Sequence, residues 1–333
     1  MELIIPITKK LTNIKIQGKP ILDHTIKFAK EKHTKINHII FIVPETQKEI
    51  VTHIQEKYKT PHKIILQKKE LGDAHAVLGA KQHIKNKDGL IIQPRFLNIY
   101  STAQNKHKDN DGIIYSQQVD AIKPATILDM QDNLITKDEH KRKKILKYFE
   151  YASGLHEDDY EDKKVEEAVG AYYTRNLMDF FETIEKLIIH ENKEQIEYQI
   201  EEVIQKQIDS GQKYITEHIK KSFNTNKKNE LIEANKEIQI QLGNNKNIGK
   251  ENIITGKNYA DKKTKIINTI IKGGCNIEEY TQIENSIIHN CIIQEGCIIK
   301  NAIISETLLE KNSKIIGTPK MQYLREKQEY IYR

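Results

Sequence analysis

The stretch "IINTIIKGGCNIEEYTQIENSIIHNCIIQEGCIIKNAII", residues 266–304, decides how the C-terminal part of this chain folds. Pairs of isoleucines recur along it and just ahead of it. The pairs end at Ile254, Ile271, Ile288 and Ile304, so they are separated by 17, 17 and 16 residues. Three of the four pairs follow the pattern Ile-x-Asn-[Thr/Ser/Ala]-Ile-Ile. A regular period indicates a repeated architecture in which each repeat is one structural unit.

Within each repeat, aliphatic side chains recur about every five or six residues. These positions are Ile271, Ile277, Ile283, Ile288, Ile293, Ile299, Ile304, Leu309 and Ile316. The spacing gives each repeat three short strands that send one side chain each into a shared interior, which predicts a triangular β-helix of about four coils over residues 241–318. It does not fit an amphipathic helix, because the apolar positions would move around the helix axis. Terminal coils need caps, and the charged segment 319–333 either caps one end or binds a partner.

The first 240 residues alternate short apolar runs with amphipathic segments, which is the pattern of an α/β domain. Strands are expected at 2–7, 37–43, 62–67 and 89–93, and helices at 21–32, 45–58 and from about residue 74. Residues 170–188 predict a strand followed by a helix, and a further helix ends at Gly211. The sheet is predicted to be mostly parallel and covered on both faces. We interpret the highly charged segment 137–168 as an insertion.

Composition excludes several classes of protein. The 53 basic and 47 acidic residues give a net charge of +6, but they are scattered, so no nucleic-acid-binding stripe is indicated. No apolar run is long enough to span a membrane, and the opening "MELIIPI" is too short for a secretory signal, so a cytoplasmic protein is expected. Cys275, Cys291 and Cys297 show no Cys-x-x-Cys spacing, which favours reduced structural thiols over a zinc site or disulfides.

Five motifs, in this order, resemble those of the sugar-phosphate nucleotidyltransferases. They are "GKPILDHTI" (18–26), "LGDAHAVLGAK" (71–81), "GAYYT" (170–174), "EYQIEEVI" (197–204) and "LIEANKEI" (231–238). The resemblance covers nearly the whole chain. It implies a Rossmann-like α/β catalytic domain followed by a short left-handed parallel β-helix. Members of this family join a nucleoside triphosphate to a sugar 1-phosphate and release pyrophosphate.

The resemblance also implies site residues. The candidates for nucleotide binding are Leu71, Gly72, Asp73, Ala74 and Arg95, and those for sugar binding are Lys141, Gly170 and Glu197. Each class of residue has a structural alternative. Gly72 and Asp73 fit the first turn of a helix, Gly170 fits tight strand packing, and Glu197 fits a solvated helix face.

Three features of the family's catalytic site are missing. The segment that should hold the glycine-rich phosphate loop contains neither a glycine nor an arginine before Gly18, so main-chain N–H groups cannot wrap a phosphate there. Arg95 and Asn224 lie where the family's metal-binding aspartates are expected. An arginine and a neutral amide would hold Mg²⁺ poorly, so no metal or other cofactor is expected unless the chain is active.

These departures lead to the hypothesis of a degenerate relative without catalysis. Losing one preorganised oxyanion donor costs roughly a hundred- to a thousandfold in rate, and here several groups are missing. Such a protein would bind a nucleotide or sugar nucleotide, with Arg95 in place of the metal's charge, or act as an assembly or regulatory subunit of a homo- or hetero-oligomer through the β-helix. The alternative is an active transferase with a rearranged site. A third class, acyl transfer by the β-helix, rests on His289.

Overall fold

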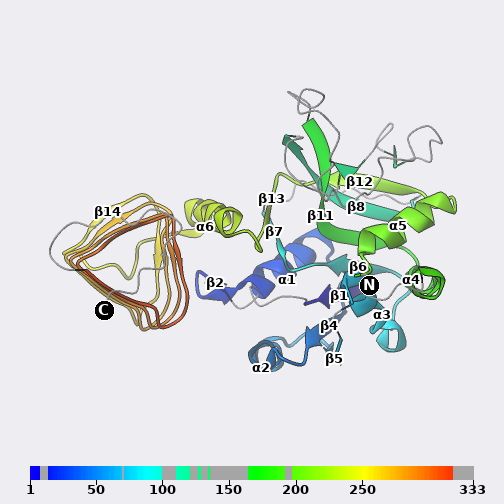
Figure 1. Ribbon diagram of the computed structural model, residues 1–333, viewed down its shortest axis with the longest axis horizontal. Helices are drawn as coiled ribbons and strands as arrows, with labels where there is room; N and C mark the ends of the chain where they lie inside the picture. Colours follow the sequence, from blue (N-terminus) through cyan, green and yellow to red (C-terminus); the bar gives the residue numbers. More distant parts are fainter. Residues whose placement is uncertain are drawn as a thin grey trace. The chain divides into compact units, whose positions relative to one another are not determined.

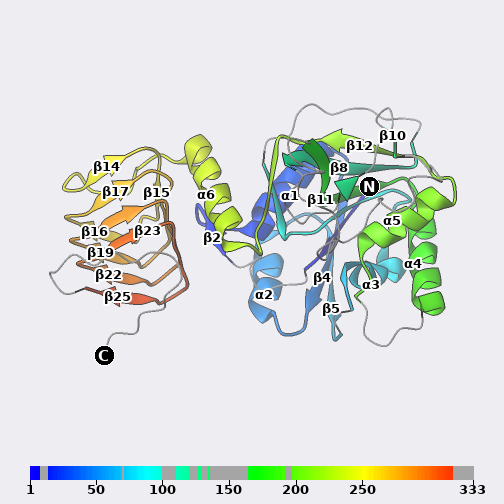
Figure 2. The ribbon, with the colours of Figure 1, turned by 45° about the horizontal axis from the view of Figure 1, so that its top comes forward.

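The computed structural model describes residues 1–7, 14–69, 71–99, 110–120, 127–128, 134–135, 164–191 and 197–317. They fall into two compact units, drawn in Figures 1 and 2. The first comprises Met1–Lys10 and Thr25–Ser222, and the second comprises Leu11–His24 and Phe223–Arg333. Lys141, most of the predicted insertion 137–168 and the predicted tail 319–333 lie outside the described residues.

A mixed nine-stranded sheet forms the centre of the first unit, in the order β10-β12-β8-β11-β6-β1-β4-β5, with β9 also paired to β11. The strands are β1 (Glu2–Pro6), β4 (His38–Pro44), β5 (His62–Gln67), β6 (Gly89–Ile92), β8 (Gly112–Asp120), β9 (Ile127–Leu128), β10 (Leu134–Ile135), β11 (Lys164–Thr174) and β12 (Tyr214–His218). β1, β4, β5 and β6 run parallel, as do β8 and β12, whereas β11 is antiparallel to both of its neighbours β6 and β8. The predicted parallel-rich α/β fold is confirmed.

Helices cover both faces of this sheet, so all seven residues of β4 are buried. The helices of the first unit are α1 (Ile21–Lys32, whose first turn belongs to the second unit), α2 (Lys48–Lys57), α3 (Asp73–Leu78), the 3-10 turn η2 (Lys81–His83), α4 (Leu177–Glu191) and α5 (Ile200–Asp209). On one face, Val77, Phe180 and Ile204 of α3, α4 and α5 pack with Ile4 and Ile91 of the sheet. α1 lies on the other face (Figure 1). It spans the same residues as the helix predicted from the sequence.

A buried polar network lies on the α1 face. Lys32 and Glu217 form an ion pair of 2.5 Å in which both side chains are almost fully buried. The next residue, His33, places Nε2 2.7 Å from the Tyr115 hydroxyl and stacks on the ring of Tyr173. Burial, and secondly the charge of Lys32, lowers the pKa of His33 to about 4. This histidine is therefore neutral at pH 7, and its ring shares a hydrogen bond with the Tyr115 hydroxyl.

The second unit contains the predicted left-handed β-helix, whose three flat sides are visible in Figure 1. Each side is a four-stranded parallel sheet. The three sheets are β14 (Ile253–Thr255), β17 (Ile270–Lys272), β20 (Ile287–His289) and β23 (Ile303–Ser305); β15 (Tyr259–Ala260), β18 (Asn276–Ile277), β21 (Ile292–Ile293) and β24 (Leu308–Leu309); and β16 (Lys265–Ile267), β19 (Gln282–Glu284), β22 (Ile298–Lys300) and β25 (Lys314–Ile316). The isoleucines that end the four repeated pairs are in register on the first sheet.

The repeated asparagine of the Ile-x-Asn pattern occupies a corner of the β-helix. Asn268, Asn285 and Asn301 have φ of 49°, 50° and 53°, a left-handed conformation that asparagine tolerates better than most residues. Their amides also bond from coil to coil, with Nδ2 to Oδ1 distances of 3.4 and 3.3 Å. The asparagines thus turn the chain and tie neighbouring coils together.

One predicted interior position is wrong. Ile316 is 53% exposed, and its neighbour Ile315 pairs with Ile299 and packs against the interior. The repeat shortens from 17 to 16 residues along the β-helix, since Ile266 pairs with Ile283, Ile283 with Ile299, and Ile299 with Ile315. A spacing of 17 therefore overshoots the last coil by one residue, and a one-residue shift turns a side chain to the opposite side of a strand.

The three cysteines lie inside the β-helix as free thiols. Burial raises the pKa of all three, that of Cys291 to about 11. They are therefore protonated and poor nucleophiles at pH 7, which agrees with structural thiols. No helix in the described parts of the chain is long and apolar enough to cross a membrane.

The N-terminal hairpin belongs to the second unit. It consists of β2 (Lys15–Ile16) and β3 (Lys19–Pro20), joined by a two-residue turn in which Gln17 and Gly18 both have positive φ. Such turns match the twist of paired strands. The remaining elements are β7 (Phe96–Ile99) in the first unit, β13 (Lys221–Asn224), in which the chain passes to the second unit, and α6 (Lys228–Leu242).

Polar side chains of the β-helix bind the backbone of this hairpin. Gln294 accepts a hydrogen bond from the Lys15 N–H (3.0 Å) and donates one to its carbonyl (3.1 Å). Asn276 accepts from the N–H of Gln17 (2.6 Å), and Glu278 accepts from that of Gly18 (3.1 Å). The β-helix therefore recognises the main chain of residues 15–18 through side chains that would otherwise need water.

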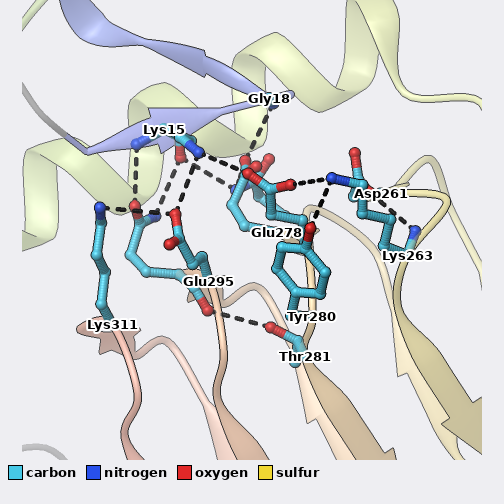
Figure 3. A network of polar contacts seen from close by, with 12 residues as sticks. Lys15, Gly18, Asp261, Lys263, Glu278, Tyr280, Thr281, Glu295 and Lys311 are labelled. Carbon is cyan, nitrogen blue, oxygen red and sulfur yellow. Dashed lines mark hydrogen bonds and ion pairs between the residues drawn. The ribbon is translucent and has the colours of Figure 1, made fainter. Parts of the chain in front are cut away.

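Charges add to this attachment, as Figure 3 shows. The Lys15 ammonium lies 3.0 Å from Glu279 and 3.2 Å from Glu295. Lys263 pairs with Glu279 and Lys311 with Glu295, so five groups of alternating sign run along one corner of the β-helix. Burial opposes the charge of Lys15, but the two carboxylates outweigh it and raise its pKa. We call this arrangement the Lys15 clamp.

Candidate functional site

Polar side chains gather beyond the carboxyl end of β6, in the first unit. Gln93 directly follows the strand, and Arg95 lies two residues further on. Asp73 begins α3, Tyr172 belongs to the neighbouring strand β11, and Glu201 lies in the first turn of α5. Ligands of open α/β sheets bind at the carboxyl ends of the parallel strands, so this is where a site is expected. We call these five residues the strand-end cluster.

Asp73, Gln93 and Arg95 form a closed ring of polar contacts. The Arg95 guanidinium places Nη2 3.2 Å from Asp73 Oδ2 and donates from Nε to Gln93 Oε1 at 3.1 Å. Gln93 Nε2 in turn donates to Asp73 Oδ2. Only 16% of the Arg95 side chain and 6% of the Asp73 side chain are exposed. The two residues therefore neutralise each other in a place where water screens their attraction poorly.

Tyr172 and Glu201 form the second part of the cluster. The Tyr172 hydroxyl donates to Glu201 Oε1 at 2.5 Å, and both residues are buried. Burial, and next the Glu201 carboxylate, holds the pKa of Tyr172 well above its usual value, whereas Arg95 acts in the opposite direction. Glu201 Oε2 is buried without a hydrogen-bond donor among the described residues. Tyr172 thus supplies the hydrogen bond to Oε1 of this carboxyl.

The turn around Gly72 is fastened to the segment before α5. The N–H of Tyr198 donates to Leu71 O (3.0 Å), and the N–H of Ala74 donates to Tyr198 O (2.9 Å). Gly72 has φ of 90°, and a Cβ there would lie 2.4 Å from Tyr198 O. The structure therefore brings the motifs "LGDAHAVLGAK" and "EYQIEEVI" together, and it uses main-chain groups of Leu71 and Ala74 for this contact.

Gly170 supports the same region from β11. Its φ is 65°, it lies where the pairing of β11 with β8 shifts register, and its carbonyl accepts a hydrogen bond from the Gln93 N–H at 2.8 Å. A Cβ at this position would lie 2.2 Å from the Phe96 ring and 2.8 Å from Gln93 Oε1. Only glycine lets Gln93 approach, so Gly170 positions the Asp73–Gln93–Arg95 ring.

The other candidates make local contacts of their own. Glu197 is exposed and accepts a hydrogen bond from Gln199 Nε2 at 3.3 Å, just ahead of α5. Asn224 is in the second unit, where its side chain accepts from the Asn226 N–H (3.0 Å) and its own N–H donates to Glu230 (2.7 Å). These contacts shape the turn before α6. Lys141 lies outside the described residues.

Sequence reasoning missed Tyr172 and Glu201. Both lie inside the quoted motifs "GAYYT" and "EYQIEEVI", so the motifs mark their neighbourhood. The sequence could distinguish the buried Tyr172 from the half-buried Tyr173 only through the alternation of side chains between the two faces of a strand. The pairing of β11 is irregular, so this alternation is not a reliable guide here.

Parts of this chain are similar in sequence to known proteins. A family model described as nucleotidyl transferase matches residues 4–120, which include most of β1, all of β6 and the strand end that carries Arg95. Over these residues the chain is similar in sequence to nucleotidyl transferases. Its relatives include the bifunctional protein GlmU of Methanococcus maripaludis (strain C5), 40% identical over 79 residues, and that of Alkaliphilus metalliredigens, 24% identical over 302 residues. These matches cover 24% and 85% of this chain, but only 18% and 61% of the relatives.

Solved structures share the fold of much of this chain. A UDP-glucose pyrophosphorylase complexed with UDP-glucose superposes with a TM-score of 0.52 at 14% identity, over 70% of this chain and 96% of that one. A nucleoside-diphosphate-sugar pyrophosphorylase from Vibrio cholerae RC9 gives 0.50 at 13% identity, over 70% and 99%. At such low identity the likeness concerns the fold alone.

The residues beyond the end of β6 do not fit a bound Mg²⁺ ion, which the resemblance to nucleotidyltransferases would place there. Mg²⁺ prefers carboxylate and water oxygens in octahedral geometry, but Arg95 supplies a cation, and the nearby Asp73 carboxylate is engaged with it. Across the described ranges, no group of three or more histidine, cysteine, aspartate or glutamate residues has the arrangement of a metal site.

Proposed function

We propose that this chain is a catalytically degenerate relative of the sugar-phosphate nucleotidyltransferases that binds a nucleotide or sugar nucleotide without Mg²⁺. The Arg95–Asp73 ion pair carries this proposal, because it lies at the strand end where the resemblance places a metal-binding aspartate. Because the Asp73 carboxylate is engaged by Arg95, it is a poor ligand for a divalent cation, and the guanidinium itself repels one.

The segment after β1 supports the same proposal. Residues 8–17, "TKKLTNIKIQ", contain no glycine or arginine, and Lys15 and Gln17 at its end are bound to the β-helix. The phosphate loop of an active enzyme would need glycines that let main-chain N–H groups approach the triphosphate. Positioning and charge neutralisation supply almost all of the catalysis in phosphoryl transfer, so losing both removes most of the rate.

Two measurements test the proposed function. Calorimetric titration with nucleotides and sugar nucleotides in excess chelator is expected to give binding that needs no Mg²⁺ and weakens on Arg95→Gln. Pyrophosphate release from panels of nucleoside triphosphates and sugar 1-phosphates is expected to stay at background. The absence of heat with every ligand would rule out the binding function.

An active transferase with a rearranged site is the alternative. Asp73 and Glu201 favour it, because they supply two buried carboxyl groups near the strand ends although Arg95 occupies the expected metal position. Turnover that depends on Mg²⁺ and is lost on changing Asp73 or Glu197 would support this alternative over our proposal.

A role in assembly is the remaining part of the proposal. Ile253, Ile270, Ile287 and Ile303 form an in-register row on the outer side of the first β-helix sheet, and Ile253 is 61% exposed. An aligned aliphatic row on a flat sheet is suited to pack against a second copy of the same row. Sedimentation velocity, compared between the parent chain and Ile287→Lys, tests this self-association.

A further inference from the structure

Arg95 is held in the manner of an anion-binding arginine. Its guanidinium lies over the Phe96 ring, with Cζ 5.3 Å from the ring centroid, and Gln93 fixes its Nε. The planar fork of arginine binds carboxylates and phosphates through the same N–H donors. A guanidinium that is already oriented loses little freedom when an anion binds, so this one is well prepared for such a ligand.

The anion in the structure is a side chain of the same molecule. Asp73 Oδ2 takes the place that a ligand oxygen would take, 3.2 Å from Arg95 Nη2, and the Gln93 amide donates to the same oxygen. One carboxylate oxygen is thus bound by a guanidinium and an amide N–H, as a phosphate oxygen often is. Asp73 comes from the first position of α3, next to the Gly72 turn, so it is part of a different element from Arg95.

We propose that Asp73 is a built-in competitor at this anion site, and that the ligand displacing it from Arg95 carries a phosphate monoester or pyrophosphate group. The inference rests on the proposed function, since it concerns the same strand-end cluster, and it adds how binding there is regulated. A site that is occupied internally for most of the time has its apparent affinity reduced by the fraction of time in which it is open. Asp73 therefore weakens anion binding while keeping Arg95 neutralised.

The test compares pyrophosphate binding by the full chain and its variants, in excess EDTA and by calorimetric titration. Asp73→Asn removes the charge while keeping the size of the side chain, and we expect about tenfold tighter binding or more. Asp88→Asn is the matched control, because Asp88 precedes the opposite end of β6 and its side chain is 39% exposed. This control should bind as the parent does. The double variant Asp73→Asn, Arg95→Gln should lose the gain.

Folding is checked for each variant by circular dichroism. If Asp73→Asn does not fold, Asp73→Ser takes its place, and the rise in Tm on adding pyrophosphate is measured as a second readout. Unchanged or weaker pyrophosphate binding by the folded Asp73 variant would overturn the inference. So would a gain that persists without Arg95, because the anion would then bind elsewhere.

The inference and the proposed function fail in different ways. If the parent chain binds a nucleotide in chelator and the Asp73 variant binds it more weakly, Asp73 is a ligand contact; the inference fails while the proposed function stands. If no nucleotide binds to the parent but the Asp73 variant gains pyrophosphate affinity through Arg95, the competitor is real and the proposed binding function fails.

Discussion

At the scale of single residues, charge placement distinguishes the strand-end cluster from a metal site. Arg95 brings a fixed positive charge, and Asp73 and Glu201 bring two carboxyl groups, all within an environment largely closed to water. Asp73 has two protein donors, Arg95 and Gln93, whereas Glu201 Oε1 accepts from Tyr172. Removing the Tyr172 hydroxyl would therefore leave a buried acceptor without this donor.

Tyr172→Phe tests this dependence. The change removes the hydroxyl that donates a hydrogen bond to Glu201 Oε1. Because the carboxyl group is buried, we expect the loss of this donor to lower the free energy of unfolding by about 2 kcal/mol. Urea denaturation measures the loss. Tyr173→Phe is the control, since its hydroxyl is 3.5 Å from Asp88 and half-buried, and it should cost less than about 0.5 kcal/mol. Equal losses in the two variants would contradict the special role of Tyr172.

At the scale of elements, the hairpin β2–β3 shows how a short segment is stabilised without a sheet of its own. Two-stranded hairpins are marginal in water, and this one has two residues in each strand. Its stability comes from Asn276, Gln294 and Glu278, whose side chains bond its main chain, and from the Lys15 clamp. The hairpin is therefore expected to loosen when the clamp is weakened.

Lys15→Met measures the contribution of the clamp. Removing the cation leaves Glu279 and Glu295 to repel each other, and we expect about 1 kcal/mol of local destabilisation. Hydrogen exchange at the N–H groups of Gln17 and Gly18 reports it, because both groups bond to the β-helix; exchange should become about fivefold faster. The difference from the parent should shrink in 1 M salt, which screens the parent's ion pairs.

Lys19→Met is the matched control for the clamp. Lys19 lies on the other strand of the same hairpin and is exposed. Its replacement should leave the exchange of Gln17 and Gly18 unchanged. If both variants accelerated exchange to the same extent, general loss of positive charge, and not the position of Lys15, would be the cause.

The β-helix was predictable from the sequence because its signal is local. Each coil repeats the same apolar positions within 16 or 17 residues, and asparagine marks one corner in three of them. The exception, Ile316, arose where the repeat shortened. In contrast, no local pattern indicates that Gln294 binds the backbone of Lys15, since the two are separated by 279 residues.

The candidate site was predictable only in part. Asp73 and Arg95 were both singled out by their motifs, but their pairing depends on how the start of α3 meets the end of β6, which residue spacing does not reveal. Glu201 looks like one of many surface glutamates in a helix. Its burial follows from the position of α5 against Tyr172, so packing, and not composition, makes it part of the cluster.

At the scale of the whole molecule, stability depends on pH through buried groups. The pKa of His33 is about 4 in the folded state and about 6.5 in an unfolded chain. Between these values the unfolded state binds more protons. The contribution of His33 is therefore fully present above pH 6.5 and is lost as the pH falls towards 4.

The expected size of this effect is about 2 kcal/mol between pH 7 and pH 5. Urea denaturation of the parent chain and of His33→Gln at the two pH values measures this effect. On acidification, the free energy of unfolding of the variant should fall by that much less than the free energy of unfolding of the parent. Direct titration of the His33 ring by NMR provides an independent value. Identical pH dependence in the parent and the variant would show that His33 does not titrate as its surroundings require.

The membership of the hairpin in the second unit has a consequence for dissecting the protein. Because Leu11–His24 folds with Phe223–Arg333, no single peptide bond divides the chain into its two units. A fragment that started at residue 223 would expose the amides of Asn276 and Gln294 to solvent, and one that ended at residue 222 would carry an orphaned N-terminal strand pair. Gene fusions and truncations that treat the β-helix as a removable C-terminal module should therefore yield proteins of reduced stability.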